Sequence, residues 1–244
     1  MTTILKLGGS VVTHKGVRES IDDEALDRVA ATVAGAADDL VLVHGAGSFG
    51  HPAADEHGLS RTEGSRDAAA ALDVHDAMGL LSAAVVARLQ DHGAAALPVH
   101  PLSAGFRDAA GGLEMATGPV EAMLGEGFLP VLHGDVVVHE GRGVTILSGD
   151  ELVAVVATAL SADHVGLCTG VPGVLDEYGE VIDHIEDYDA VADLLGGSDA
   201  TDVTGGMAAK VQMLLDLDAP ASVFGTGDLE AFLEGGSPGT LVGG

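Results

Sequence analysis

Short apolar segments alternate with helical patterns along almost the whole chain, and no other feature limits the possible fold as strongly. Residues Ile4–Leu7, Leu40–Val43 and Val165–Cys168 are brief apolar runs of the kind that form buried strands. Between them lie residues 22–37, with apolar side chains at helical spacing, and a long alanine-rich segment, residues 65–90. Strands that alternate with helices form a mostly parallel sheet covered on both faces. The sequence therefore predicts an α/β fold, a three-layer sandwich with a mostly parallel central sheet.

The remaining predicted elements follow the same two patterns. Five more apolar runs are expected to form strands: Leu129–Leu132, Val136–His139, Val144–Leu147, Ser222–Phe224 and Thr240–Val242. Three more segments are expected to form helices: residues 150–160, 207–217 and 229–233. With 244 residues and no internal repeat or obvious linker, the chain is long enough for one sizeable domain or for two lobes that share a core.

The charge of the chain is strongly negative. Its 38 acidic and 10 basic residues give a formal net charge of −28. Self-repulsion of this size destabilises a compact protein in dilute buffer, whereas in molar salt the Debye length is only about 3 Å. The composition therefore suits a very salty cytoplasm, a halophilic adaptation. It also argues against nucleic acid as a partner, because no basic face is available to neutralise phosphates.

Targeting signals and reactive cysteines are not expected. No apolar run approaches the roughly 18 to 20 residues that span a bilayer, and the N-terminus has no signal-peptide pattern. We therefore expect a cytoplasmic protein with no membrane partner. The single cysteine, Cys168, lies in an apolar run and is expected to be an inert strand residue.

Two glycine-rich turns follow predicted strands, one at Gly8-Gly9-Ser10 and one at residues 45–50. At the carboxyl end of a parallel strand, such turns direct backbone N–H groups outward, where a phosphate can accept hydrogen bonds. The second turn also matches the G-x-G-x-x-G pattern of dinucleotide-binding proteins, which requires a helix that begins within the motif and an acidic residue at the end of the next strand. Pro52 and Gly58 argue against that helix, and residues 67–73 lie in a helical pattern. We therefore disfavour a dehydrogenase.

The three lysines of the chain each lie near a glycine-rich turn. Lys6 ends the first strand, Lys15 follows the first turn, and Lys210 follows Thr204-Gly205-Gly206. A single lysine is ordinarily a surface residue, but this chain keeps only three lysines against 38 acidic residues, so we expect the remaining lysines to do something that acids cannot. Phosphoryl transfer requires positive charge on the transferring oxygens and little covalent chemistry from the protein. The lysines therefore favour phosphoryl transfer.

Three motifs resemble those of the amino acid kinase superfamily: Lys6–Ser10, Leu147–Asp150 and Asp202–Lys210. Within it, the segment Gly8–Lys15 and the segment His44–His51 resemble the isopentenyl phosphate kinase family. The resemblance implies an amino acid kinase-like fold and an ATP-dependent enzyme that phosphorylates isopentenyl phosphate to isopentenyl diphosphate in a variant mevalonate pathway. It also implies ATP and Mg²⁺ as cofactors and a homodimer. A single domain, residues 1–244, would comprise an acceptor-binding lobe (1–140) and an ATP-binding lobe (141–244).

The same resemblance implies roles for individual residues. Lys6 and Lys210 would bridge the transferring phosphoryl group, Asp150 would hold both lysines, and Lys15 would contact ATP phosphates or the transition state. His51 would bind the phosphate of the acceptor. Backbone groups along the ATP phosphates would come from Gly8, Gly9, Ser10, Gly47 and Gly205. The residues facing the acceptor would include Ala46, Gly47 and Gly50. No metal ligand within the chain is implied.

Alternatives remain for several of these residues. His51 suits a phosphate because a histidine beside backbone amides is readily protonated there, but it could also cap a turn. Asp150 could be a plain helix N-cap. The helical residues Val74, Met78, Leu81 and Val85 could form an apolar wall for the isoprenoid tail or belong to the core. The segment 168–174 lacks the acidic residues that relatives usually carry there, which affects any metal or nucleotide contact made by it.

Two other functions also fit the sequence. A sibling kinase could act on a carboxylate, a nucleotide or a phosphonate, although His51 favours a phosphate or phosphonate acceptor. A non-catalytic regulator on the same fold would bind ATP without forming product, and the presence of all three lysines argues against it.

Overall fold

The structure, a computed structural model, describes residues 1–192 and 206–244 and has one large sheet at its centre. Eight strands lie in the order β10-β12-β11-β9-β1-β2-β6-β3, and all pairs are parallel except β11 with β12. The strands are β1 (Thr3–Leu7), β2 (Leu40–His44), β3 (Ala96–Val99), β6 (Leu129–His133), β9 (His164–Thr169), β10 (His184–Ile185), β11 (Ala221–Gly225) and β12 (Thr240–Val242). The predicted mostly parallel sheet is confirmed.

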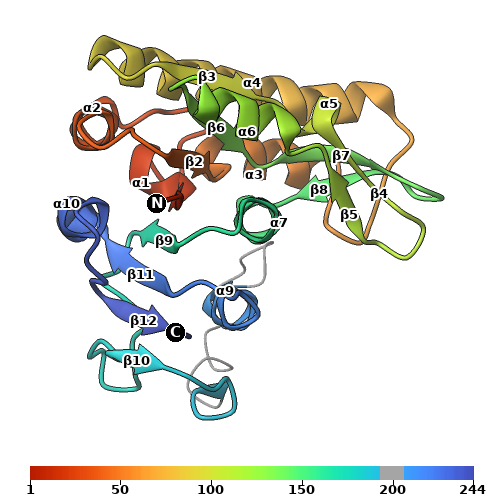
Figure 1. The fold of residues 1–244 in the computed structure, drawn as a ribbon. Coiled ribbons are helices and arrows are strands. Elements are labelled where there is room, and N and C mark those ends of the chain that lie inside the picture. The colour runs from red at the N-terminus through yellow and green to blue at the C-terminus, as the bar shows by residue number, and fades with distance from the viewer. Residues whose placement is uncertain (193–205) are drawn as a thin grey trace.

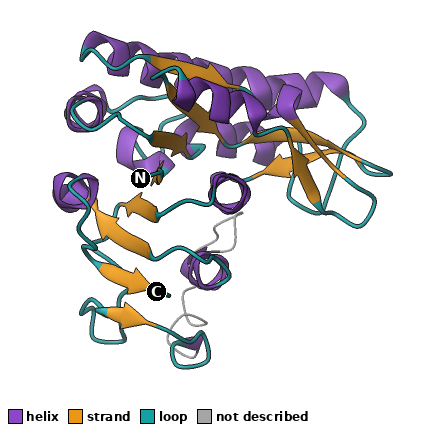
Figure 2. Cartoon of the chain, viewed as in Figure 1, coloured by secondary structure: helices purple, strands orange, loops and turns teal. Residues whose placement is uncertain are grey.

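Helices cover both faces of this sheet, as Figures 1 and 2 show. One face packs against α1 (Gly9–Val12), α2 (Asp23–Ala34), α3 (Gly47–Glu56), α4 (Ala68–Asp91) and α10 (Leu229–Leu233). The other packs against α6 (Gly118–Gly125), α7 (Gly149–Leu160) and α9 (Gly206–Leu215). A short 3-10 helix, η1 (Thr226–Asp228), precedes α10. Each strand sends alternate side chains to the two faces, so the fold has two aliphatic cores, one on each side of the sheet.

A second sheet of four strands lies beside the first and was not expected. Its order is β5-β4-β7-β8, formed by β4 (Gly105–Arg107), β5 (Leu113–Met115), β7 (Asp135–His139) and β8 (Gly143–Leu147), and the short helix α5 (Pro101–Ala104) precedes it. The strands predicted near residues 136–139 and 144–147 are therefore present, but they pair outside the central sheet. Figure 1 shows this sheet projecting to the right of the main layers.

The helix α3 contradicts the expectation that Pro52 prevents a helix in the second glycine-rich turn. Pro52 lies inside α3, where its missing N–H leaves the carbonyl of Ser48 without the usual helical donor. The backbone N–H of Glu19 donates to that carbonyl at 2.8 Å. The proline is therefore accommodated because a loop from another part of the chain replaces the lost hydrogen bond.

The helix α4 matches the helix predicted over residues 65–90, but it is more apolar than expected, because no membrane-length apolar segment was predicted. It has 24 residues and is long and apolar enough to cross a membrane, although half of its most apolar window is buried inside the protein. Its buried residues include Leu81 and Val85, which belong to the core between α4 and the sheet. We therefore interpret α4 as a core helix, and Leu81 and Val85 do not form the apolar wall suggested above.

Candidate active site

A cavity of ≈760 Å³ opens at the carboxyl ends of β1, β2 and β6. It brings together residues from segments far apart in the chain. The residues predicted from the sequence that line it are Lys6, Gly8, Gly9, Ser10, Lys15, Ala46, Gly47, Gly50, His51, Asp150 and Lys210. Gly205, also predicted, lies outside the described residues. The rest of the predicted set therefore shares one cavity.

The two glycine-rich turns pack directly against each other, backbone to backbone. A Cβ added to Gly9 would lie 2.0 Å from the nitrogen of Gly47, and one added to Gly45 would lie 2.7 Å from the nitrogen of Gly9. Gly47 also has a positive φ of 50°, which side chains disfavour. Glycine is therefore required here for close packing of the two turns, in addition to any approach of a phosphate.

Lys6, Asp150 and Lys210 form the lysine–aspartate cluster at the base of the cavity. Lys6 Nζ donates to Asp150 Oδ1 at 2.7 Å, and the two side chains are only 9% and 12% exposed. Lys210 Nζ lies 3.7 Å from Asp150 Oδ2 and 3.2 Å from the carbonyl oxygen of Gly206. One carboxylate thus lies between two ammonium groups, with little solvent to screen them.

Asp150 is not the N-cap of α7, contrary to that alternative. Ser148 is the N-cap, because its hydroxyl accepts from the backbone N–H of Glu151 at 3.2 Å. In return, the carboxylate of Glu151 accepts from the backbone N–H of Ser148 at 3.0 Å. Because this capping box satisfies the start of the helix, the carboxylate of Asp150 is available to Lys6. The cluster also lies at the positive end of the α7 dipole, which favours anions nearby.

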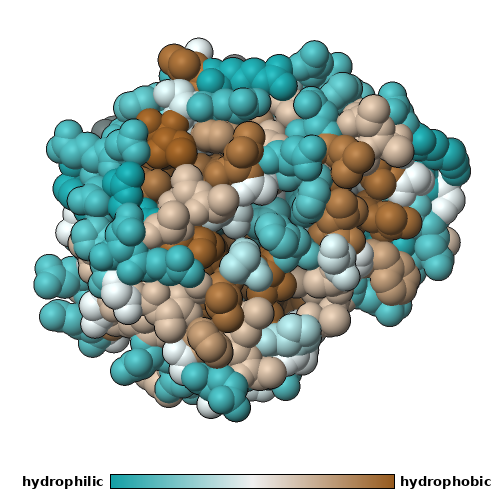
Figure 3. All heavy atoms as spheres, turned by 90° about the horizontal axis from the view of Figure 1, so that it is seen from above, coloured by the Kyte–Doolittle hydropathy of each residue, from teal (hydrophilic) through white to brown (hydrophobic). Residues whose placement is uncertain are grey.

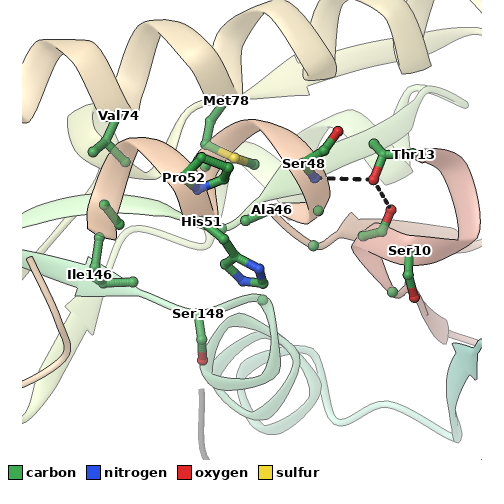
Figure 4. A pocket seen from close by; sticks show the side chains of 18 of the residues that line it. Ser10, Thr13, Ala46, Ser48, His51, Pro52, Val74, Met78, Ile146 and Ser148 are labelled. Atoms are coloured by element: carbon green, nitrogen blue, oxygen red, sulfur yellow. Dashed lines mark hydrogen bonds between the residues drawn. The ribbon is translucent and has the colours of Figure 1, made fainter. Parts of the chain in front are cut away.

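The loop that carries Lys15 is tied to the start of α3. Thr13 Oγ1 donates to the carbonyl of Gly9 at 2.8 Å and accepts from the N–H of Ser48 at 3.1 Å, as Figure 4 shows. The Ser48 hydroxyl donates to the carbonyl of Ser20 at 3.1 Å. Together with the Glu19–Ser48 bond, these contacts hold both ends of the loop and keep Lys15 at the rim of the cavity.

The opposite side of the cavity combines one polar side chain with an apolar wall. In Figure 4, His51 projects from α3 toward the start of α7, below Pro52, Val74 and Met78. Ile146 lies further along the same wall. Gly50 packs on Met78, because a Cβ there would lie 2.6 Å from its sulfur. A ligand with an anionic head and an apolar tail fits such a surface.

Comparison with known proteins decides the family. The model of the amino acid kinase family matches residues 1–217. The isopentenyl phosphate kinase of Haloferax volcanii is 56% identical over 98% of this chain and 97% of its own length. That of Methanocaldococcus jannaschii is 34% identical over 88% and 86%. The chain belongs to the isopentenyl phosphate kinase branch of the amino acid kinase family. A crystal structure of an isopentenyl phosphate kinase superposes with a TM-score of 0.85 and 28% identity, covering 99% of this chain and all of that one.

Membership of the amino acid kinase family excludes the dehydrogenase alternative. The prediction that no helix begins within the G-x-G-x-x-G motif was nevertheless wrong. A helix does begin within the G-x-G-x-x-G motif, as α3. The second requirement is not met, because the segment after α3 is the helix α4 and the next strand, β3, begins only at Ala96. No acidic residue therefore ends a strand about 20 residues after the motif.

Sequence reasoning missed Arg18, which also lines the cavity of this family member. Arg18 Nη1 donates to Glu56 Oε2 at 2.6 Å, and Nη2 lies 3.7 Å from Asp73 Oδ2. The hydrogen bond that Arg18 donates to Glu56 raises the pKa of the guanidinium, so this side chain stays charged. Its sequence neighbourhood carries no motif, and only the pairing with α3 and α4 shows that it closes one edge of the cavity.

Thr169 lines the cavity in the segment that departs from the usual family pattern. Its hydroxyl donates to the carbonyl of Val171 at 2.9 Å and so holds the turn after β9. The preceding Cys168 is buried, and its desolvation, with a smaller effect of the Asp228 charge, raises the pKa of the thiol to about 12. The thiol therefore stays protonated, which confirms the expectation of an inert strand residue.

We expect the protein to lose stability in acid because two histidines, His44 and His133, are fully buried. Desolvation by burial lowers the pKa of each from 6.5 to about 4. Between pH 6.5 and about pH 4, the unfolded chain therefore binds more protons than the folded chain. The free energy of unfolding falls as the pH falls through this range. At pH 5 we expect each histidine to reduce the free energy of unfolding by about 2 kcal/mol relative to pH 7.

Denaturant unfolding in molar KCl at pH 7 and pH 5 measures this loss. A His44→Asn variant keeps a donor toward Gly45 but has no titrating ring, so about half of the pH dependence is expected to disappear. Equal free energies of unfolding of the parent protein at the two pH values would contradict the prediction.

Proposed function

We propose that this protein transfers the γ-phosphoryl group of ATP to isopentenyl phosphate and so forms isopentenyl diphosphate and ADP. The observation that carries this proposal is the arrangement of the cavity. The lysine–aspartate cluster lies at its base, while His51 and an apolar wall of Val74 and Met78 line its other side. The names of the relatives support this acceptor. The family resemblance described above implies a place in a variant mevalonate pathway.

The transfer would proceed by direct displacement. An oxygen of the acceptor phosphate attacks the γ-phosphorus while the bond from that phosphorus to the β-phosphate oxygen breaks, and ADP leaves. Lys6 and Lys210 would stabilise the negative charge on the equatorial oxygens, and Asp150 would keep both ammonium groups oriented before ATP arrives. Lys15 would contact the ATP phosphates from the rim, and His51 would hold the phosphate of the acceptor.

The two substrates would bind to different parts of the chain. The acceptor would lie against residues 1–140, which contribute His51, Ala46 and Gly50, and ATP would lie mainly against residues 141–244. Gly8, Gly9, Ser10 and Gly47 belong to residues 1–140, but they share the cavity with Asp150 and Lys210 and would direct backbone N–H groups at the ATP phosphates. Gly205 is proposed to join them.

Mg²⁺ would accompany ATP as its phosphate complex. Within residues 1–192 and 206–244, no group of three or more histidine, cysteine, aspartate or glutamate side chains could hold a metal ion. Asp150, the acidic member of the cluster, already accepts a bond from Lys6 at 2.7 Å. The described residues therefore do not fit a resident metal site, and Mg²⁺ would be held chiefly by the ATP phosphates.

An acceptor panel tests this function. In molar KCl with ATP and Mg²⁺, kcat/KM is measured for isopentenyl phosphate, UMP and N-acetylglutamate. We expect turnover with isopentenyl phosphate alone, because only it combines a phosphate for His51 with a tail for the apolar wall. Turnover with UMP or N-acetylglutamate alone would contradict the proposed acceptor, and ATP binding without any product would favour a regulator.

We also propose that the protein works in a cytoplasm of high salt. With a net charge of −28, screening by salt stabilises the folded chain. The midpoint of thermal unfolding is expected to rise by roughly 10 °C between 0.1 M and 2 M KCl, equivalent to about 5 kcal/mol for a chain of 244 residues. A midpoint that does not change with KCl would contradict this adaptation.

A homodimer is the proposed assembly. Helix α4 exposes Leu72 and Leu80, which are 52% and 61% exposed, together with small apolar residues such as Ala83 and Ala87. Figure 3 views the molecule from above, and on that face hydrophobic residues form patches between hydrophilic ones. Sedimentation equilibrium in molar KCl should give twice the chain mass, and a mass equal to one chain would contradict the dimer.

A further inference from the structure

Four histidines form a row behind the acceptor side of the cavity, and we call them the histidine array. His44 and His133 end the neighbouring strands β2 and β6, where they are register partners, and their ring centroids lie 5.5 Å apart. His133 lies 5.2 Å from His100, which precedes α5, and His100 lies 5.8 Å from His75 of α4. The array thus connects two central strands with the helix that carries Val74 and Met78.

The hydrogen bonds of the array indicate which ring nitrogen of each histidine carries the proton. Nδ1 of His44 lies 3.2 Å from the carbonyl oxygen of Gly45, and Nδ1 of His133 lies 2.9 Å from that of Gly134. A carbonyl only accepts, so we assign the proton to Nδ1 in both rings, which leaves Nε2 of His133 as an acceptor. His100 Nδ1 lies 3.0 Å from that Nε2 and therefore donates to it.

Asp135 joins the array to the cavity that it lines. Its side chain has no exposed surface, and both of its oxygens lie 3.0 Å from His75 Nδ1. It also accepts from the backbone N–H of Val136 at 2.8 Å and of Leu102 at 3.3 Å. Donors from α4, β7 and α5 thus converge on one buried carboxylate, which fixes these elements relative to one another.

A continuous set of contacts leads from Asp135 to the proposed ligand of the acceptor phosphate. His75 lies on α4 directly after Val74 and one turn before Met78, and both of these residues line the cavity. The sulfur of Met78 occupies the space beside Gly50, the residue before His51. Lys6 and Lys210 lie outside this set, on β1 and α9. A shift of α4 would therefore move the acceptor side and leave the lysine–aspartate cluster in place.

We propose that His75 and Asp135 are positioning residues for the acceptor. Their hydrogen bonds hold α4 against the turn between β6 and β7, and this sets the positions of the apolar wall and of His51. The inference rests on the proposed function, because it assigns the acceptor to this side of the cavity. Asp135 acts through these donors and not by presenting its charge to an anionic substrate.

Two substitutions of His75 test this role. His75→Ala leaves the buried carboxylate short of a donor, so we expect the KM for isopentenyl phosphate to rise about tenfold. The KM for ATP and kcat at saturating substrates should stay within about twofold of the parent values, since the lysine–aspartate cluster is unaffected. His75→Asn places an amide nitrogen close to the position of Nδ1 and should restore most of the acceptor affinity.

A surface pair provides the matched control. His92 Nε2 lies 3.0 Å from Asp27 Oδ1, a similar contact that is partly exposed and lies away from the cavity. His92→Ala should leave both KM values unchanged. Equal increases of both KM values in His75→Ala would overturn the inference, as would an Asn variant that folds but behaves like the Ala variant. If His75→Ala does not fold, the comparison of His75→Asn with His75→Gln replaces it, because Gln moves the amide away from Asp135 and should lose acceptor affinity.

Turnover measured with the parent protein distinguishes a failure of this inference from a failure of the proposed function. Absence of turnover with isopentenyl phosphate in the parent protein would overturn the proposed function, and the inference with it. Normal turnover in the parent protein together with an unchanged acceptor KM in folded His75→Ala would overturn only the role of the array.

Discussion

Lys6→Met is expected to lower kcat by roughly 10³-fold, the largest effect of any single substitution considered. Lys6 is one of two ammonium groups held by Asp150 at the base of the cavity, and its charge would stabilise oxygens that gain charge as the phosphoryl group moves. Loss of an interaction made mainly in the transition state lowers kcat and kcat/KM together. Steady-state kinetics with ATP and isopentenyl phosphate in molar KCl measure both values.

The fold needs its own control, because Lys6→Met also leaves Asp150 with a buried charge that has lost its closest partner. Breaking such a pair costs about 3 kcal/mol of stability, whereas removing both charges costs less. The double variant Lys6→Met/Asp150→Asn should therefore regain stability without regaining activity. Arg28→Met removes a cation that pairs with Glu24 on the surface of α2 and should leave kcat unchanged. Activity within tenfold of the parent in Lys6→Met would remove Lys6 from the transfer step.

His51→Ala is expected to raise the KM for the acceptor by roughly 10- to 100-fold, because a hydrogen bond to a charged group is lost. The affinity for ATP should not change, since most groups proposed to bind its phosphates lie on β1, α1, α9 and the Lys15 loop. Gly47 lies on α3 with His51, but it would contribute a backbone N–H that the substitution leaves in place. Isothermal titration with a non-hydrolysable ATP analogue, together with acceptor kinetics, separates the two effects.

A histidine far from the cavity, His184, provides the control for His51. His184 of β10 is 40% exposed at its side chain and contacts the carbonyl of Gly243 at the far edge of the sheet. His184→Ala should behave like the parent protein. An acceptor KM in His51→Ala equal to that of His184→Ala would remove His51 from the acceptor site.

Much of the central sheet could be predicted from the sequence because its strands are continuous apolar runs buried on both sides. β1 and β9 are examples, with almost every residue buried. β4 and β5 could not be found in this way, since each has three residues of mixed polarity. The helix α3 was also missed, because Pro52 breaks the local pattern and the bond that compensates for it comes from Glu19, in a different loop.

The residues of the site likewise fall into those that the sequence predicts and those that only the structure shows. Lys6, Lys15 and Lys210 stand out by composition alone, and the glycine-rich turns mark where strands end. The pairing of Lys6 with Asp150 joins residues 144 positions apart, and only resemblance to a family pointed to it. Asp135, His75 and Arg18 carry no motif, and their importance comes from long-range contacts that no local pattern contains. His44-Gly45 and His133-Gly134 end two neighbouring strands, but His-Gly also occurs at His57 and His92, so the dipeptide alone does not mark the array.

The identity of the product tests the central claim most directly. Phosphorus-31 NMR of ATP, Mg²⁺, isopentenyl phosphate and the protein in molar KCl would follow every phosphorus atom. The account predicts equal amounts of ADP and isopentenyl diphosphate, seen as two coupled doublets of the new diphosphate, and only a trace of this product with Lys6→Met over the same time. Formation of ADP with inorganic phosphate alone, or no change in ATP, would contradict phosphoryl transfer to this acceptor.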